Sequence, residues 1–395
     1  MKVKGFLKDV GGASRVTAMR KELLEKGSPV PDPKDPIRDL ADRLHPGAQE
    51  FTVTEIRDVS PTSKTFRLKP VNKHVPVFQC GQFASFELNI GNSVLTRAYS
   101  ISSAPFEARG EEPFFEITIR RNRSYFVPDW FFENVRVGSS LTVSLPYGHF
   151  YYEPLRDSRN IIAIAGGSGI TPFVSMAKEI VHGTLDVNLT VLYGSVSHTD
   201  IVCKDELDSC EKACPEKIRI IHVMSDDESW EGEKGFITKQ LIEKYAAAIE
   251  DPSYFFCGPA VMFFQIEKIM KEMNVPLRRF RHDTIPQPDV KLIPGFPKEQ
   301  TGKTYKMTVV RGIHEDVIDA AADEPIAVSL ERAGIKVDTK CRGGECGHCR
   351  AQLLSGNIFV SPLGDYRRAM DKELGWFHSC SAYPAEDLKI KIPIL

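Results

Sequence analysis

The stretch Cys341-Arg-Gly-Gly-Glu-Cys-Gly-His-Cys349, followed far along the chain by Cys380, decides the character of the C-terminal part of the protein. A C-x4-C-x2-C run with a distant fourth cysteine is the plant-type spacing for a [2Fe-2S] cluster. Such a cluster needs soft thiolate ligands, and Gly343, Gly344 and Gly347 let the backbone turn closely around it because they carry no Cβ. The predicted cluster ligands are Cys341, Cys346, Cys349 and Cys380.

Zinc is the alternative metal for this stretch. A zinc site usually combines paired C-x2-C elements or Cys/His partners, whereas this segment has one C-x2-C step and no second pair. His348 lies between two of the cysteines, and we interpret it as a loop residue rather than a ligand.

Four cysteines outside this stretch have irregular spacing and are interpreted as structural thiols: Cys80, Cys203, Cys210 and Cys214.

The composition is that of an ordinary globular protein. A length of 395 residues predicts two to four domains. The 51 Lys and Arg residues nearly balance the 53 Asp and Glu residues, so no basic field would attract nucleic acid. No apolar run is long enough to span a bilayer, and the first residues lack the apolar core of an export signal. We therefore expect a cytoplasmic protein without a membrane span.

Changes in pattern divide the chain into five segments. Residues 1–48 are expected to form a short helical extension, and residues 49–155, with their short β-rich runs, a small antiparallel barrel. Residues 156–285 alternate buried-type strands with helices, which is typical of an α/β domain with a parallel sheet. The proline-rich residues 286–304 predict a linker, and residues 305–395 a compact α+β domain.

Two helices are expected in the N-terminal extension. Ser14 is the predicted cap of the first helix, and Gly27 its end. Asp35 is the predicted cap of the second helix, and Pro36 fits its first turn.

A glycine turn follows the apolar strand from Ile161 to Ala165 and leads into a predicted helix. Glycines there permit close approach of a phosphate to free backbone N–H groups and to the positive end of the helix dipole. Thr171 is expected to cap the helix and Pro172 to suit its first turn. A proline replaces the third glycine of the usual dinucleotide fingerprint, and a merely structural turn is the alternative. The predicted phosphate-binding residues are Gly167, Ser168, Gly169, Thr171 and Pro172.

A second fragment, Cys257-Gly258-Pro259, ends a later strand and opens another helix. Because the carboxyl ends of parallel strands meet at one edge of a sheet, we expect it to reach the same ligand site. Cys257 is then a candidate neighbour of a nicotinamide. Taken alone, it would more often be a small buried hydrophobic residue.

The tetrapeptide Arg97-Ala98-Tyr99-Ser100 lies between predicted barrel strands. Its residue types suit a flavin, with a guanidinium for phosphate, an aromatic ring for the isoalloxazine face and a hydroxyl for the edge around N5. Taken alone, such residues are more often a surface arginine and a core tyrosine.

In this order the motifs resemble the ferredoxin-NADP reductase superfamily. They are similar to the iron-sulfur flavoprotein reductases with a C-terminal ferredoxin domain, in the order of phthalate dioxygenase reductase. The resemblance implies a β-grasp ferredoxin domain, and Arg97 at a flavin phosphate, Tyr99 against the ring and Ser100 near N5. It also implies a pyridine nucleotide at Gly167 to Pro172, with Cys257 to Pro259 beside the nicotinamide. Ser100 and Cys257 are the predicted catalytic residues.

Two departures from the family limit this transfer. Where relatives place a Gly-x-x-Ser turn for the flavin phosphate, this chain has Tyr125-Phe126-Val127-Pro128, so phosphate contacts are expected from Arg97, Ile119 and Arg120. FAD is favoured over FMN because of the aromatic segment 146–150. Val196 replaces an arginine of NADP-preferring relatives, so NADH is favoured over NADPH.

The expected activity is electron transfer from NADH through a flavin to the [2Fe-2S] cluster and on to a separate acceptor protein, such as an oxygenase, a hydroxylase or another reductive enzyme. Hydride delivery requires the orientation of two stacked rings rather than a general acid. Two alternatives remain open. One is a stand-alone diaphorase or flavin reductase, and the other is a non-enzymatic redox carrier or sensor.

Overall fold

The computed structural model describes residues 6–27, 35–44, 46–72, 74–121 and 126–393. The chain divides into two compact units, residues 1–43 and 44–395. All nine cysteines lie in the described part, and none of them forms a disulfide.

The N-terminal unit consists of helix α1 (Phe6–Lys26) and most of helix α2 (Pro36–Leu44). The Asp35 cap is confirmed, because its Oδ1 accepts hydrogen bonds from the backbone N–H groups of Ile37 (3.1 Å) and Arg38 (3.0 Å). The predicted cap at Ser14 is wrong, because α1 begins at Phe6 and runs through it. A glycine costs only about 1 kcal/mol inside a helix, and the helix therefore continues through the glycines before Ser14.

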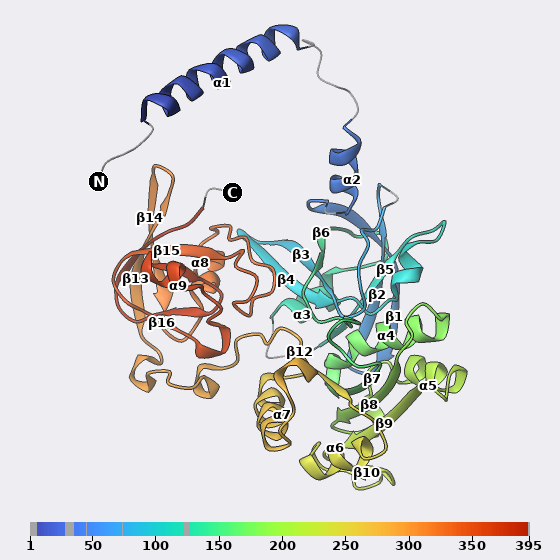
Figure 1. Cartoon of the computed structure of the whole chain (residues 1–395). Coiled ribbons are helices and arrows are strands. Elements are labelled where there is room, and N and C mark those ends of the chain that lie inside the picture. The colour runs from blue at the N-terminus through green and yellow to red at the C-terminus, as the bar shows by residue number, and fades with distance from the viewer. Residues whose placement is uncertain (1–5, 28–34, 45, 73, 122–125, 394–395) are drawn as a thin grey trace. The chain divides into compact units, whose positions relative to one another are not determined.

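The second unit begins with a six-stranded antiparallel sheet (Figure 1). Its strands are β1 (Gln49–Ser60), β2 (Ser63–Pro70), β3 (Phe83–Ile90), β4 (Ser93–Ser100), β5 (Phe115–Arg120) and β6 (Ser140–Tyr147), and helix α3 (Phe126–Asn134) follows β5. The order is β4-β3-β6-β1-β2-β5, and an antiparallel bridge between Ile101 and Ile117 joins the two ends. The sheet therefore curls into the expected barrel around a core that includes Phe66, Phe86 and Phe131.

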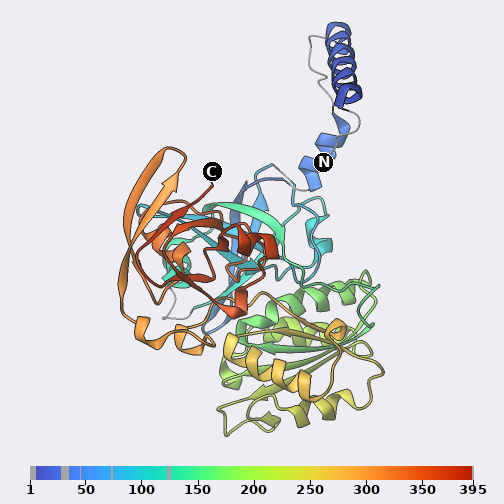
Figure 2. The same ribbon diagram turned by 60° about the vertical axis from the view of Figure 1, so that its left-hand side comes forward.

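A six-stranded parallel sheet of order β10-β9-β8-β7-β11-β12 follows the barrel. Its strands are β7 (Asn160–Gly166), β8 (Asn188–Ser195), β9 (Ile218–Met224), β10 (Glu233–Lys234), β11 (Ser253–Cys257) and β12 (Phe280–His282). Alternate residues of β7 point to opposite faces, so Ala163 packs in one core and Ile164 in the other. Helices α4 (Thr171–His182) and α5 (Lys204–Ala213) cover one face, and α6 (Lys239–Ala246) and α7 (Ala260–Glu272) the other (Figures 1 and 2).

The C-terminal domain is a β-grasp fold built on a five-stranded sheet of order β14-β13-β19-β15-β17. Its strands are β13 (Thr304–Arg311), β14 (His314–Ala321), β15 (Arg350–Ser355), β17 (Trp376–His378) and β19 (Leu388–Lys391). The predicted first and last strands, β13 and β19, pair in parallel. Helix α8 (Ile326–Arg332) packs on this sheet, and a second sheet pairs β16 (Ile358–Val360) with β18 (Ala382–Pro384), while the short helix α9 (Ala369–Glu373) precedes β17.

The segment expected to be a linker, residues 286–304, packs on the C-terminal domain. Val290, Ile293 and Phe296 are buried against Tyr383 and Phe359. The segment is too irregular to show a period in the sequence, yet these apolar side chains attach it to one domain.

Candidate functional site

The glycine turn and the Cys257-Gly258-Pro259 fragment meet at one edge of the parallel sheet. A Cβ on Gly169 would lie 2.2 Å from the carbonyl oxygen of Cys257, and a Cβ on Gly166 would lie 2.9 Å from Cδ of Pro259. Gly167 has φ +55°, a left-handed conformation that favours glycine. The structure therefore brings together the two fragments that the sequence assigns to a nucleotide.

The predicted cap at Thr171 is wrong in detail. Residues 167–170 form a single 3-10 turn, so Ile170 is the capping residue and Thr171 is already the first residue of α4. Its hydroxyl donates to the carbonyl oxygen of Ser168 (3.1 Å) instead of accepting from the helix N–H groups. Pro172 lies in the first turn of α4, as expected.

The close packing at Gly169 gives a first prediction. Gly169→Ala should destabilise the fold by about 2 kcal/mol or more, since its Cβ would overlap the backbone of Cys257. If the turn binds a nicotinamide nucleotide as expected, the variant should also bind it at least about tenfold more weakly, because the turn must shift. Thermal unfolding and titration with NADH measure both effects. Gly110→Ala is the matched control, because no atom lies within 4 Å of its added Cβ, and equal losses in both variants would contradict the prediction.

The flavin motif lies on strand β4 rather than between strands. Sequence periodicity misses this strand because few of its side chains are fully buried. The Tyr99 ring packs edge-on against Phe86 and Phe131 in the barrel (centroids 5.7 and 5.5 Å apart), and burial raises the pKa of its hydroxyl. Ser100 ends the strand, so its hydroxyl lies at the rim of the barrel.

Ser100 and Cys257 are brought together by a residue that sequence reasoning missed, Asp283. The carboxylate Oδ2 of Asp283 accepts from Ser100 Oγ at 3.3 Å and from Cys257 Sγ at 3.5 Å. Its Oδ1 accepts from the backbone N–H of Thr284 at 2.7 Å. Burial raises the pKa of Asp283, and burial together with the Asp283 charge raises that of the Cys257 thiol. Asp283 follows β12 directly, so its place at the carboxyl end of a strand was the available signal.

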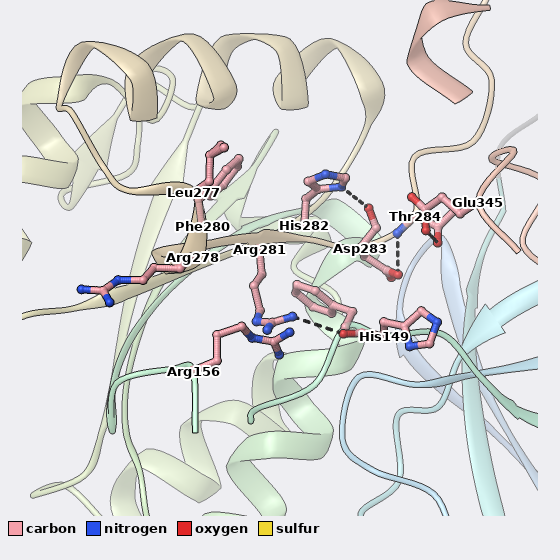
Figure 3. A pocket seen from close by; sticks show the side chains of 11 residues that line it. His149, Arg156, Leu277, Arg278, Phe280, Arg281, His282, Asp283, Thr284 and Glu345 are labelled. Atoms are coloured by element: carbon pink, nitrogen blue, oxygen red, sulfur yellow. Dashed lines mark hydrogen bonds between the residues drawn. The ribbon is translucent and has the colours of Figure 1, made fainter. Parts of the chain in front are cut away.

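Asp283 also lies at one end of a cavity of about 250 Å³, shown in Figure 3. Arg281 and Arg156 line its opposite side, and Arg281 binds the buried carboxylate of Asp157 (2.9 Å). Thr284 and Glu345 complete the acidic end, where Thr284 Oγ1 donates to Glu345 Oε2 at 2.9 Å. Burial raises the pKa of Glu345 to about 7. Since Glu345 belongs to the cysteine loop, that loop lies next to Asp283.

Two of the three residues predicted for the flavin phosphate, Ile119 and Arg120, have side chains that contact other parts of the protein. Ile119 is buried in the barrel core. The Arg120 guanidinium donates to Asp200 Oδ2 (2.8 Å) and to Thr62 Oγ1 (3.1 Å), and it would lie 2.8 Å from a Cβ on Gly167. Arg120 therefore joins the barrel to the glycine turn of the α/β domain.

Arg97 points toward the C-terminal domain. Its Nη1 donates to its neighbour's carbonyl oxygen, Thr96 O (2.7 Å), and lies 3.6 Å from Glu331 Oε2. Burial, followed by the charge of Arg342, lowers the pKa of Arg97 to about 10. The guanidinium stays charged at neutral pH.

The four predicted ligand cysteines form two pairs. Cys349 Sγ lies 3.2 Å from Cys380 Sγ, and the backbone N–H of Cys346 donates to Cys341 Sγ at 3.4 Å. Across the described ranges, no three His, Cys, Asp or Glu side chains converge on a site for a single metal ion. A [2Fe-2S] cluster instead takes two ligands at each of two irons, so two thiol pairs fit it.

The loop between Cys341 and Cys346 requires a glycine at position 344. It has φ +85°, and an added Cβ would lie 2.1 Å from the carbonyl oxygen of Gly364. His348 binds Asp338 (3.0 Å) and packs edge-on against Tyr147 of the barrel. These contacts agree with its interpretation as a loop residue.

Comparison with protein families finds three matches along the chain. Residues 50–152 match the oxidoreductase FAD-binding domain, residues 163–268 the oxidoreductase NAD-binding domain, and residues 312–385 the 2Fe-2S iron-sulfur cluster binding domain. Their order is the one expected from the motifs.

Several known proteins are similar to large parts of this chain. The glycine betaine monooxygenase reductase subunit of Chromohalobacter salexigens is 23% identical over 335 residues, which cover 80% of this chain and 87% of that protein. NADH-cytochrome b5 reductase 1 of Candida glabrata is 28% identical over 237 residues, 58% of this chain and 80% of that protein. The structure of phthalate dioxygenase reductase superposes with a TM-score of 0.62 at 20% identity, covering 91% of this chain and 100% of that chain.

The three folds, their order and the paired cysteines define a modular flavin and iron-sulfur electron-transfer protein. The chain has the FAD-binding, NAD-binding and iron-sulfur domains in the order found in phthalate dioxygenase reductase, and it is an NAD(P)H-dependent oxidoreductase. In the part of the chain that the structure describes, every helix is too short or too polar for a bilayer span.

Proposed function

We propose that this protein oxidises NADH and passes the electrons, by way of FAD and a [2Fe-2S] cluster, to a separate redox protein in the cytoplasm. One observation carries the proposal. Asp283 binds the hydroxyl of Ser100 at the end of strand β4 and the thiol of Cys257 at the end of strand β11. The neighbouring Thr284 binds Glu345 of the cysteine loop. Parts of three domains thus converge on two adjacent residues.

The side chains at this point have separate tasks. Ser100 would contact the N5 edge of the flavin, and Cys257 would lie against the nicotinamide, so Asp283 would orient both through its carboxylate. Gly167, Ser168, Gly169 and the first turn of α4 would bind the phosphates of the nucleotide. When bound, the flavin accepts a hydride, and the iron-sulfur cluster carries single electrons. The four cysteines would hold the cluster in two pairs.

FAD is preferred to FMN because of an aromatic segment at the barrel rim. Tyr147 stacks on Phe83 (centroids 5.8 Å apart, rings inclined by 29°), so the segment 146–150 offers ordered aromatic surface next to the flavin motif. Phosphate contacts of the flavin would come from Arg97 and from the backbone of Ile119 and Arg120, because the Ile119 side chain is buried in the barrel and the Arg120 guanidinium is bound to Asp200. The match to an FAD-binding family supports the same choice.

NADH is preferred to NADPH because the far end of the nucleotide site is acidic. Asp226 bonds through its backbone N–H to the carbonyl oxygen of Val196 (2.9 Å), and Asp227 accepts from the backbone N–H of His198 (2.8 Å). Hydrogen bonds from Ser229 and His198 lower the pKa of Asp227, so it is a carboxylate at neutral pH. Two carboxylates beside Val196 would repel a 2′-phosphate.

This preference can be reversed by two substitutions. The double variant Val196→Arg/Asp226→Asn should raise the ratio of kcat/KM for NADPH to that for NADH about tenfold or more, since it adds a charged hydrogen bond and removes a repulsion. Steady-state kinetics with both nucleotides measure the ratio. The matched control is Val181→Arg, at an exposed position near the other end of α4. If the control shifts the ratio as much, the assignment fails.

An oxygenase component is the proposed class of electron acceptor. The name of the Chromohalobacter relative describes a reductase subunit of a monooxygenase, and that protein is matched over most of its length.

The cysteines support the proposed cytoplasmic location, because nine free cysteines suit a reducing compartment.

Anaerobic titration of the purified holoprotein with NADH tests the proposal. We expect the flavin absorbance to bleach first and the iron-sulfur absorbance to follow, with cluster reduction confirmed by electron paramagnetic resonance. A flavin that stays oxidised in excess NADH and NADPH would overturn the assignment as a reductase. Turnover with dyes but with no protein acceptor would instead select a diaphorase.

A further inference from the structure

The ferredoxin domain contacts flavin strand β4 through a group of five polar side chains, which we call the β4 contact: Thr96 and Arg97 of β4, Glu331 of helix α8, and Thr339 and Arg342 at the start of the cysteine loop. Arg342 Nη1 donates to the carbonyl oxygen of Thr96 (3.2 Å), and the hydroxyls of Thr96 and Thr339 are hydrogen-bonded. Glu331 Oε1 and Oε2 accept from the two terminal nitrogens of Arg342 at 2.5 and 3.1 Å. The ferredoxin domain and the barrel are thus joined at the strand that carries the flavin motif.

Glu331 is the anion of the β4 contact. Its side chain is only 3% exposed, and it faces two cations, Arg342 of its own domain and Arg97 of the barrel. A buried carboxylate shared between two guanidinium groups offsets their repulsion and its own desolvation. Without that charge, Arg97 and Arg342 would repel each other in a site with little water.

Arg342 also connects the β4 contact to the cysteine pairs. It directly follows Cys341 and has φ +57°, a strained conformation for a residue with a side chain. The bidentate bond to Glu331 and the bond to Thr96 hold it there. Loss of either contact would let the start of the cysteine loop relax.

We propose that Glu331 is a positioning residue that docks the ferredoxin domain on the flavin barrel by holding Arg97 and Arg342 together, and so sets the separation between flavin and cluster. The docking part stands on these contacts, and its effect on electron transfer rests on the proposed function. A second, exposed contact supports the docking, because Lys336 Nζ lies 2.9 Å from Glu87 of strand β3.

Two holoprotein variants and a control test the proposal. In Glu331→Gln, amides of residues 93–100 should exchange hydrogen at least about tenfold faster, because a buried charge pair is broken. Transfer of electrons from reduced flavin to cluster, followed by stopped flow, should slow by a similar factor. Lys336→Glu, which is exposed and should not disturb folding, should accelerate exchange about two- to fivefold, and Glu87→Lys/Lys336→Glu should restore it. Lys389→Glu, which breaks an exposed pair with Glu315 inside the ferredoxin domain, is the control and should change neither quantity.

Exchange mass spectrometry decides docking independently of activity. Wild-type exchange rates in both Glu331→Gln and Lys336→Glu, with an unchanged rate of cluster reduction, would overturn the proposal. Faster exchange that Glu87→Lys/Lys336→Glu reverses would support docking even if NADH failed to reduce the flavin. That last result would refute the proposed function alone, so the two failures are distinguishable.

Discussion

Replacing Cys380 by serine should leave a protein that keeps its flavin and loses its iron. Cys380 is the one predicted ligand outside the loop, it is buried, and its Sγ lies 3.2 Å from that of Cys349. A serine hydroxyl is a hard, neutral group that binds iron poorly where a thiolate is needed. We expect iron and sulfide to fall to a small fraction of the wild-type content, and reduction of a protein acceptor to fall more than about a hundredfold. Iron, sulfide and flavin analyses measure the contents.

The loss should be specific to the paired thiols. Cys214→Ser is the matched control, because Cys214 is free, lies in the α/β domain and bonds to Glu216. It should retain full iron and activity. Cys380→Ser protein with wild-type iron content would contradict the assignment of the ligand set. Loss of flavin reduction by NADH in Cys380→Ser would show that the domains do not act separately.

The parts of this molecule that could be predicted from sequence are the motifs whose residues lie close together in the sequence. The cysteine loop, the glycine turn after β7 and the flavin tetrapeptide each lie within about ten residues, so each can be seen in the sequence. Spacing alone indicates the cysteine loop, whereas the other two are interpreted from the order of all the motifs. The strands of the parallel sheet can also be predicted from their apolar runs, because the sheet is buried on both faces.

The residues that were missed act across domains. Thr96 and Thr339 are 243 positions apart and Ser100 and Asp283 are 183 positions apart, yet each pair is hydrogen-bonded. No periodicity encodes such contacts, because they depend on how folded domains pack rather than on local spacing. Arg97 illustrates the difference, since its sequence context suggests a phosphate whereas its nearest anion is Glu331 of another domain.

Asp283 should control the rate of flavin reduction. Asp283→Asn keeps the size of the side chain and one acceptor, but it removes the charge that the Ser100 hydroxyl and the Cys257 thiol share. Hydrogen bonds to a charged group are stronger by about 1 kcal/mol or more, so orientation at the hydride site should loosen. Stopped-flow reduction by NADH should slow about tenfold, with iron content unchanged. Asp58→Asn, on the exposed part of β1, is the control and should react as wild type.

Asp283→Asn should be more stable than the wild type at neutral pH, although it reduces the flavin more slowly. Because burial raises the pKa of Asp283 above that of the unfolded chain, the folded state holds the proton more tightly, and its carboxylate opposes folding once the pH exceeds the folded-state pKa. Wild-type free energy of unfolding should therefore decline, relative to Asp283→Asn, as the pH rises from 3.8 through the raised value. The charge of Asp283 also acts on His282 and helps to raise the pKa of Glu345, so the difference between the two proteins includes the effect of Asp283 on these two neighbours. Denaturant unfolding of both proteins across that pH range measures the difference in the free energy of unfolding. If that difference does not change with pH, the Asp283 carboxylate does not oppose folding. A charge that weakens the fold while it speeds the reaction is expected of a carboxylate that positions side chains between the two proposed cofactor sites.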